Sequence, residues 1–143
     1  MKTVMQLLQT KGQNVWSITP DAWVIDALKL MAEKRVGALL VLEAGQVVGI
    51  ISERDYARKV SLLGKSSKTT PVREIMTEKV VYVRPEQTIE DCMALMTDKR
   101  IRHLPVLADD KLIGVISIGD VVKAVISEQE FIIAQLENYI IGR

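Results

Sequence analysis

Residues 48–55 read VGIISERD, and residues 113–120 read IGVISIGD. The same spacing of 65 positions relates further pairs upstream without a gap, namely Pro20 and Pro85, Asp26 and Asp91, and Met31 and Met96. A repeat of this length indicates one structural unit used twice. Two such units fill most of the 143 residues, which leaves no room for a separate catalytic domain.

Composition narrows the class of protein. The chain is 48% hydrophobic, which suits one compact domain or a tightly paired duplicate. A net charge of +1 and 4% aromatic residues argue against a dedicated nucleic-acid binder. No apolar run approaches the roughly 20 residues of a membrane span, and the N-terminus lacks the apolar core of a signal peptide. Cys92 is the single cysteine, so we predict a cytoplasmic chain without an internal disulfide, binding neither nucleic acid nor membrane.

Each repeat is predicted to run strand, helix, strand, strand, helix. Apolar spacing in the first repeat predicts a strand over 14–18, a helix from Asp21, strands over 38–42 and 47–51, and a helix from Ser52 to Val60. Asp21 is expected to be the helix N-cap or a first-turn acid. The second repeat should follow the same order from Val80 to Ile126. The predicted fold class is α/β (α+β), with small sheets covered by helices.

The predicted domains are a first unit over 7–60, a linker over 61–71, a second unit over 72–126 and a helical tail over 127–143. Gly12 is a good C-terminal stop for an N-terminal helix. The tail places apolar residues at helical spacing and has no counterpart after the first repeat. Such an unpaired apolar edge needs a partner surface, so we predict a homodimer.

The paired pattern of Pro-acid-helix, apolar strand and Gly-x-x-Ser-x-x-Asp resembles tandem CBS domains, the regulatory module named after cystathionine β-synthase. The resemblance runs from Leu7 to Ile126, and both copies carry the signature. It implies two units related by a pseudo-two-fold axis, with clefts between their sheets that bind adenine nucleotides. It also implies a stand-alone CBS pair with no attached enzyme or channel.

Ser52 with Asp55, and Ser117 with Asp120, each stand where a predicted strand ends and a helix begins. One interpretation is a capping box, in which the serine and the acid three residues later satisfy backbone N–H groups. Asp is short for that reach, which favours the alternative that it binds the hydroxyls of a ribose. The resemblance assigns ribose recognition to the Asp and a polar contact to the Ser.

Basic residues are candidates for phosphate contact. Arg102 and His103 precede the buried strand of the second repeat, where related CBS pairs place basic residues against phosphates. Arg54 and Arg58 follow Ser52, and the second repeat has Gly119 and Lys123 at these positions, so the two clefts should differ. Lys11 is a further candidate. The alternative for all of these side chains is a solvated surface.

The adenine is expected in apolar slots that combine residues of both repeats. Trp16 has the alternative of being an ordinary core residue. The candidates near Asp120 are Val15, Trp16, Val36 and Gly37, and those near Asp55 are Val80, Tyr82 and Ile101.

The leading hypothesis is a signal-transduction module that binds AMP, ADP or ATP, with NAD(H) as a further candidate, and signals to an unknown protein through conformation or assembly. The alternatives are an interaction protein with vestigial clefts and an S-adenosylmethionine sensor. No nucleophile with a base and no metal-ligand spacing is present in the sequence, so no catalytic residue, metal or catalytic cofactor is predicted.

Overall fold

The computed structural model describes residues 2–140, and these residues group into two units. The first unit is Val15–Val81. The second unit combines the segment 1–14 with residues 82–143. The N-terminal segment therefore belongs to the unit that the second repeat builds, and the grouping in space differs from the order of the repeats along the chain.

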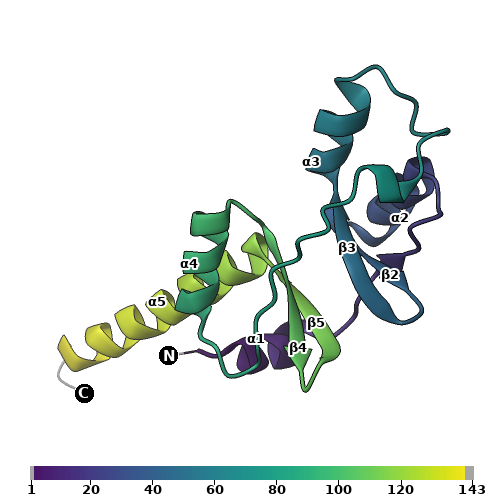
Figure 1. Ribbon diagram of the computed structural model, residues 1–143. Helices are drawn as coiled ribbons and strands as arrows, with labels where there is room; N and C mark the ends of the chain where they lie inside the picture. Colours follow the sequence, from purple (N-terminus) through teal and green to yellow (C-terminus); the bar gives the residue numbers. More distant parts are fainter. Residues whose placement is uncertain (1, 141–143) are drawn as a thin grey trace. The chain divides into compact units, whose positions relative to one another are not determined.

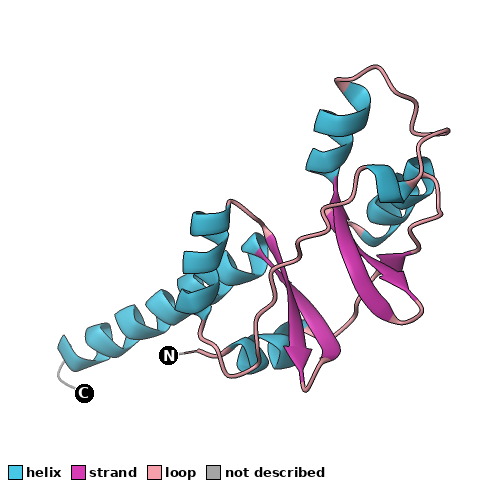
Figure 2. Ribbon diagram, viewed as in Figure 1, coloured by secondary structure: helices cyan, strands magenta, loops and turns pink. Residues whose placement is uncertain are grey.

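The first unit holds one three-stranded sheet, seen in magenta in Figure 2, with strand order β1-β2-β3 (Figure 1). Strand β1 pairs parallel to β2, and β2 pairs antiparallel to β3. The elements are β1 (Ser17–Ile18), α2 (Val24–Lys34), β2 (Ala38–Glu43), β3 (Gln46–Ser52), α3 (Glu53–Tyr56), the π-helical turn η1 (Ala57–Ser61) and the 3-10 turn η2 (Val72–Glu74). The core lies between α2 and the sheet and includes Val24, Met31 and Leu39, each at most 2% exposed.

Helix α2 begins later than the sequence predicted. Its N-cap is Trp23, and Asp21 lies in the preceding turn, where its carboxylate pairs with Arg73. The turn is closed by the Ala22 N–H, which donates to the Thr19 carbonyl at 3.2 Å and so delays the helix. The expectation that Asp21 caps the helix or lies in its first turn is therefore wrong, and Asp26 is the first-turn acid.

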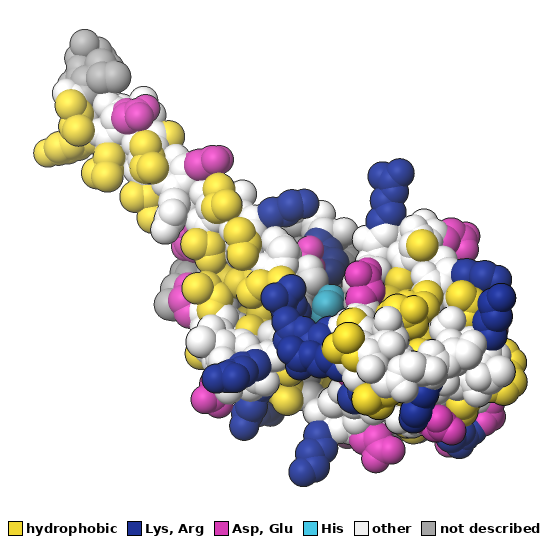
Figure 3. Space-filling model, turned by 90° about the horizontal axis from the view of Figure 1, so that it is seen from above, with side chains coloured by type: hydrophobic (Ala, Val, Ile, Leu, Met, Phe, Trp, Pro, Cys, Tyr) yellow, Lys and Arg dark blue, Asp and Glu magenta, His cyan; other side chains and the backbone are white. Residues whose placement is uncertain are grey.

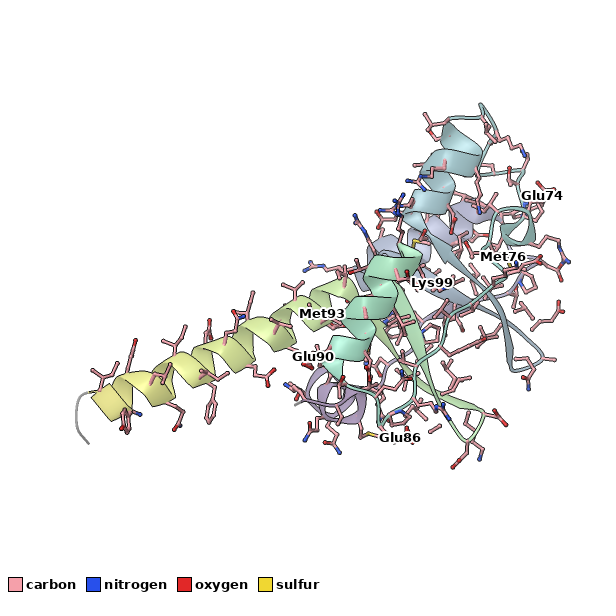
Figure 4. All side chains as sticks on the ribbon, turned by 60° about the vertical axis from the view of Figure 1, so that its left-hand side comes forward. Glu74, Met76, Glu86, Glu90, Met93 and Lys99 are labelled. Atoms are coloured by element: carbon pink, nitrogen blue, oxygen red, sulfur yellow. The ribbon has the colours of Figure 1, made fainter. Side chains whose placement is uncertain are left out.

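The chain returns to β3 after the polar segment that follows η1. Ile50 and Thr77 exchange two backbone hydrogen bonds of 3.0 and 2.8 Å. Gly49 allows this approach, because a Cβ there would lie 2.8 Å from the sulfur of Met76, which is labelled in Figure 4, and 3.0 Å from the Thr77 carbonyl. Residues 72–77 therefore complete the first unit.

The second unit holds a two-stranded antiparallel sheet (Figure 1). Its elements are α1 (Val4–Lys11), α4 (Ile89–Lys99), β4 (His103–Ala108), β5 (Lys111–Ser117) and α5 (Ile118–Ile140).

The strand predicted at the start of the second repeat is reduced to a single bridge between Val83 and Val106. In the first repeat the Leu40 N–H donates to the Trp16 carbonyl at 3.3 Å. The position equivalent to Leu40 is Pro105, which has no N–H to donate. The second sheet consequently loses one strand, and the expectation of identical repeats is wrong at this point.

Helix α1 is built into the second unit by backbone hydrogen bonds and apolar contact. The Val4 N–H donates to the Gln87 carbonyl at 2.8 Å, and the Ile89 N–H donates to the Lys2 carbonyl at 3.0 Å. Leu8 is fully buried, and its side chain covers Gly114 of β5. The helix ends at Gly12, whose φ of 98° confirms the predicted stop.

Helix α5 is a single helix of 23 residues, so the predicted tail continues the last helix of the second repeat. Its first turns bury Val121 and Ala124, whereas the residues beyond Ser127 are largely exposed. Residues 141–143 of the predicted tail lie outside the described residues. Within residues 2–140, no helix has both the length and the apolar content that a membrane span requires.

Candidate functional site

The first Ser-Asp motif forms a capping box at the start of α3. The Asp55 N–H donates to Ser52 Oγ at 3.2 Å, and Asp55 Oδ2 accepts from the Ser52 N–H at 2.9 Å. The expectation that aspartate is too short for this reciprocal bond is wrong. The extended backbone of Ser52, with φ −127° and ψ 164°, brings its N–H toward the first helical turn.

Asp55 is engaged at both carboxylate oxygens. Its Oδ2 also accepts from the Ser52 hydroxyl at 3.1 Å, and its Oδ1 lies 3.2 Å from Lys59 Nζ. Lys59 Nζ in turn donates to the Ile75 carbonyl at 2.9 Å. The Asp55 side chain is 13% exposed. This carboxylate is therefore fully used in holding its own unit together.

The second motif, Ser117 with Asp120, forms the same backbone hydrogen bonds as the first, but the carboxylate oxygens of its aspartate have different partners. The Asp120 N–H donates to Ser117 Oγ at 3.2 Å, and Asp120 Oδ2 accepts from the Ser117 N–H at 2.8 Å. Lys11 Nζ donates to the same Oδ2 at 2.5 Å and to the Val115 carbonyl at 2.6 Å. Among residues 2–140, Oδ1 of Asp120 has no hydrogen-bond partner. One oxygen of this acid is thus available to a ligand.

The charges around Asp120 fix its ionisation. Burial alone would raise the pKa of Asp120, but the hydrogen bonds from Lys11 and Ser117 and the charge of Lys11 outweigh burial and lower it. Asp120 is therefore an anion at neutral pH and remains an acceptor for hydroxyl groups.

Arg102 and His103 lie directly beside the second motif. His103 pairs with Ser117 across the β4–β5 ladder, and the Ile118 N–H donates to the Arg102 carbonyl at 2.8 Å. In the first unit Ala38 pairs with Ser52 in the same way, and the Glu53 N–H donates to the Gly37 carbonyl. The two motifs therefore share a backbone frame, and the second carries basic side chains where the first carries none.

His103 is neutral in this setting. Burial, followed by the positive charge of Lys11, lowers the pKa of His103 below 6.5, although Asp120 opposes the shift. At neutral pH the imidazole of His103 therefore acts as a hydrogen-bonding group, and its phosphate contact stays a prediction.

The other predicted residues fall in both units. Arg54 and Arg58 are exposed on α3 and η1 of the first unit, whereas Arg102 belongs to the second, and their predicted phosphate contacts stay a prediction. The same holds for the adenine slots that combine both repeats. Val36 and Gly37 lie in the unit of Asp55, and Ile101 lies in the unit of Asp120. The apolar candidates that are half-buried are Val15, Val36, Gly37, Val80, Tyr82 and Ile101.

Trp16 is not a core residue, because 37% of it is exposed. The ammonium of Lys34 lies 4.5 Å from its ring centroid, a cation–π contact at the surface of the first unit.

Lys59 was not among the predicted site residues. Its signal in the sequence is the spacing of four between Asp55 and Lys59, which places opposite charges on one face of a helix. Within the described part of the chain, no group of three or more metal-binding side chains occurs.

Titration of His103 is a direct test of these electrostatics, because it is the one histidine of the sequence. We expect an NMR titration midpoint below 6.5, and a higher midpoint in Lys11→Met, which lacks the nearby positive charge. The unfolded chain then takes up the proton first as pH falls through 6.5, so stability should decline from there toward the lower folded midpoint. A midpoint above 6.5 would contradict the burial of the imidazole.

The model of the CBS domain matches residues 7–62 and 72–127. The mitochondrial CBS domain-containing protein CBSX3 of Arabidopsis thaliana is 45% identical over 150 aligned positions, which cover 98% of this chain and 72% of that protein.

Solved structures extend the comparison. A protein with CBS domains from Burkholderia ambifaria MC40-6, named for signal transduction, has a TM-score of 0.87 and 56% identity, covering 90% of this chain and 96% of that one. The CBS domain pair of protein MJ0100, in complex with 5'-methylthioadenosine and S-adenosyl-L-methionine, has a TM-score of 0.77 and covers 87% of this chain and 99% of that one. Its identity of 21% shows the shared fold alone.

Proposed function

Since the chain belongs to the CBS domain family, with two CBS domains, we propose that it is a regulatory module that binds an adenine nucleotide and has no catalytic activity of its own. The candidates are AMP, ADP, ATP and NAD(H). The nucleotide changes the conformation or assembly of the protein, and a partner protein responds. This role matches the signal-transduction name of the relative from Burkholderia ambifaria.

The observation that carries the proposal is the state of Asp120. This carboxylate is ionised, 20% exposed and held by Ser117 through Oδ2, while Oδ1 is open to a ribose hydroxyl. Arg102 directly precedes β4, whose first residue pairs with Ser117, and we expect its guanidinium to reach phosphate oxygens. A ribose acceptor beside a phosphate donor is the chemistry that a nucleotide needs.

S-adenosylmethionine is the second candidate ligand, because the MJ0100 pair was solved with it. It shares the ribose that Asp120 would bind. However, its sulfonium and ammonium groups would meet the positive charges of Lys11 and Arg102, whereas phosphate groups are attracted to them. We therefore favour phosphorylated adenosines.

The function is tested by thermal unfolding with AMP, ATP, NADH and S-adenosylmethionine in one buffer. A ligand present at about 100 times its Kd adds roughly 2.7 kcal/mol of stability, which raises the Tm by several degrees. Asp120→Ala should remove most of this shift. Asp98→Ala is the matched control, since Asp98 is 77% exposed on α4 of the same unit. If no ligand raises the Tm, the alternative of vestigial clefts is favoured. If S-adenosylmethionine raises the Tm most, our preference for phosphorylated adenosines is wrong.

We also propose that two copies pair through α5. Apolar residues recur along this helix at alternating spacings of four and three, the pattern of helices that pack against one another. The positions are Ile118, Val122, Val125, Ile132, Leu136 and Tyr139, with Gln129 as the one polar member.

Among residues 2–140, no other element of the unit covers the C-terminal part of this seam. Ile132 is 51% and Leu136 56% exposed, and hydrophobic side chains follow one side of α5 in Figure 3. Figure 4 shows this part of the helix clear of the other elements of the second unit. A second copy supplies an identical apolar face through two-fold symmetry, the commonest closed arrangement of soluble oligomers.

The cellular compartment stays a prediction. The sequence indicates the cytoplasm, while the relative from Arabidopsis thaliana is named mitochondrial. Both compartments contain adenine nucleotides, so the proposed function does not depend on this choice.

A further inference from the structure

Lys11 contacts Asp120, the residue that we propose binds the ribose of the ligand. It is the last residue of α1, and its ammonium lies between Asp120 Oδ2 at 2.5 Å and the Val115 carbonyl at 2.6 Å. The two charged residues are separated by 109 positions. Their side chains are 29% and 20% exposed, so the pair is partly shielded from water. The carboxylate proposed to bind ribose is thus neutralised by a cation of the same chain.

The first unit shows that this arrangement is particular to Asp120. Asp55 is also paired with a lysine, but Lys59 stands four residues later in the same helical segment and binds Oδ1. The second repeat has Ala124 at the position equivalent to Lys59. In the second unit the cation beside the aspartate is Lys11 of α1. Its ammonium and the Ser117 N–H donate to the same oxygen, Oδ2 of Asp120. Lys11 therefore joins two distant segments of the chain at the candidate ribose acceptor, whereas Lys59 links Asp55 to the Ile75 carbonyl of its own unit.

Charge balance decides which ligands can use Asp120. A ribose that donates both of its hydroxyls to the carboxylate reaches Oδ2 as well as the open Oδ1, and the ammonium of Lys11 then loses its hydrogen bond to Oδ2. A neutral nucleoside offers nothing in exchange, and the ammonium is left in a partly desolvated place, which is costly. A nucleotide offers phosphate oxygens, to which the ammonium on its flexible four-carbon stem can move.

We propose that Lys11 is the charge-selecting residue of the Asp120 site. Without ligand it occupies Asp120, and with ligand it binds the phosphate, so that phosphorylated adenosines enter and neutral nucleosides are rejected. This inference rests on the proposed function and names its selectivity. Arg102 adds attraction for phosphate from the β4 side, but it makes no contact with Asp120 among the described residues, so selection against adenosine depends on Lys11.

The test is calorimetric titration of AMP and adenosine into the wild type and Lys11→Met. Methionine keeps an unbranched stem and removes the charge. We expect AMP to bind the variant more weakly and adenosine to bind it more tightly, so that the ratio of the two affinities falls by about tenfold or more, the value of one charge-assisted hydrogen bond. Opposite changes for the two ligands would not arise from a loosened structure, which weakens both.

Three further variants complete the design. Lys11→Arg keeps the cation and should keep the preference for AMP. Lys11→Gln removes the charge but keeps a donor for Asp120, and should lose the preference even if Lys11→Met does not fold. Lys111→Met is the matched control, because Lys111 is exposed at the start of β5 in the same unit. If AMP binds and its preference over adenosine is unchanged in Lys11→Met and Lys11→Gln, the inference is wrong while the proposed function stands. If the wild type binds neither AMP nor adenosine, the inference is wrong, and the proposed function is then decided by the thermal shifts with ATP and NADH.

Discussion

Leu8→Ala is expected to lower the free energy of unfolding by about 2–5 kcal/mol, the range for truncating a buried leucine. Leu8 is fully buried, and a Cβ added to Gly114 would lie 2.7 Å from its Cδ2 atom. The contact joins α1 to β5, so the loss falls on the second unit although Leu8 stands near the N-terminus. Urea unfolding monitored by circular dichroism measures the change through the transition midpoint.

Leu62→Ala is the matched control for this substitution. Leu62 is 79% exposed, so the same truncation should change stability by less than about 0.5 kcal/mol. Equal effects of the two substitutions would show that α1 is not part of the folded second unit.

Leu136→Asp is expected to convert a dimer into a monomer. Light scattering of the wild type should report about twice the 16.0 kDa chain mass. Two-fold symmetry places the substituted residue in the interface twice, and each unpaired carboxylate loses several kcal/mol of solvation there. The dimer dissociation constant should therefore rise more than about a hundredfold.

Ala134→Asp introduces the same charge on the same helix, two residues from Leu136 and outside the apolar seam. It should leave the measured mass unchanged. A wild-type mass of 16.0 kDa would refute the dimer, and a Leu136→Asp variant that stays dimeric would move the interface to another surface.

The repeat in the sequence was sufficient to predict the fold class, since both copies carry the same apolar spacing and the same strand-to-helix junction. The prediction that both repeats form the same strands was wrong where a single residue removes a backbone hydrogen-bond donor. Pro105 in place of Leu40 removes a hydrogen-bond donor, and the edge strand of the second sheet is lost with it. The prediction that Asp21 starts the helix was also wrong, because a tight turn lies between Asp21 and the first residue of α2.

The candidate site was predictable in its local parts and not in its long-range ones. Ser117 and Asp120 follow each other within one turn, so their pairing can be inferred from spacing alone. The partnership of Lys11 with Asp120 depends on how α1 folds onto the second repeat, which no local pattern reveals. The neutral state of His103 likewise follows from burial and from a lysine far away in the sequence.

The division of the second unit into two distant segments also sets an order for its formation during synthesis. Residues 15–81 contain everything that the first unit needs, so this unit can form while the ribosome is still translating the rest. Helix α1 is made earlier but must wait for β5. At about 5–20 residues per second, the 106 residues from Lys11 to Ser117 take roughly 5–21 s to synthesise. During that time the apolar side of α1 has no native partner, which makes the nascent chain a substrate for chaperones before the mature protein exists.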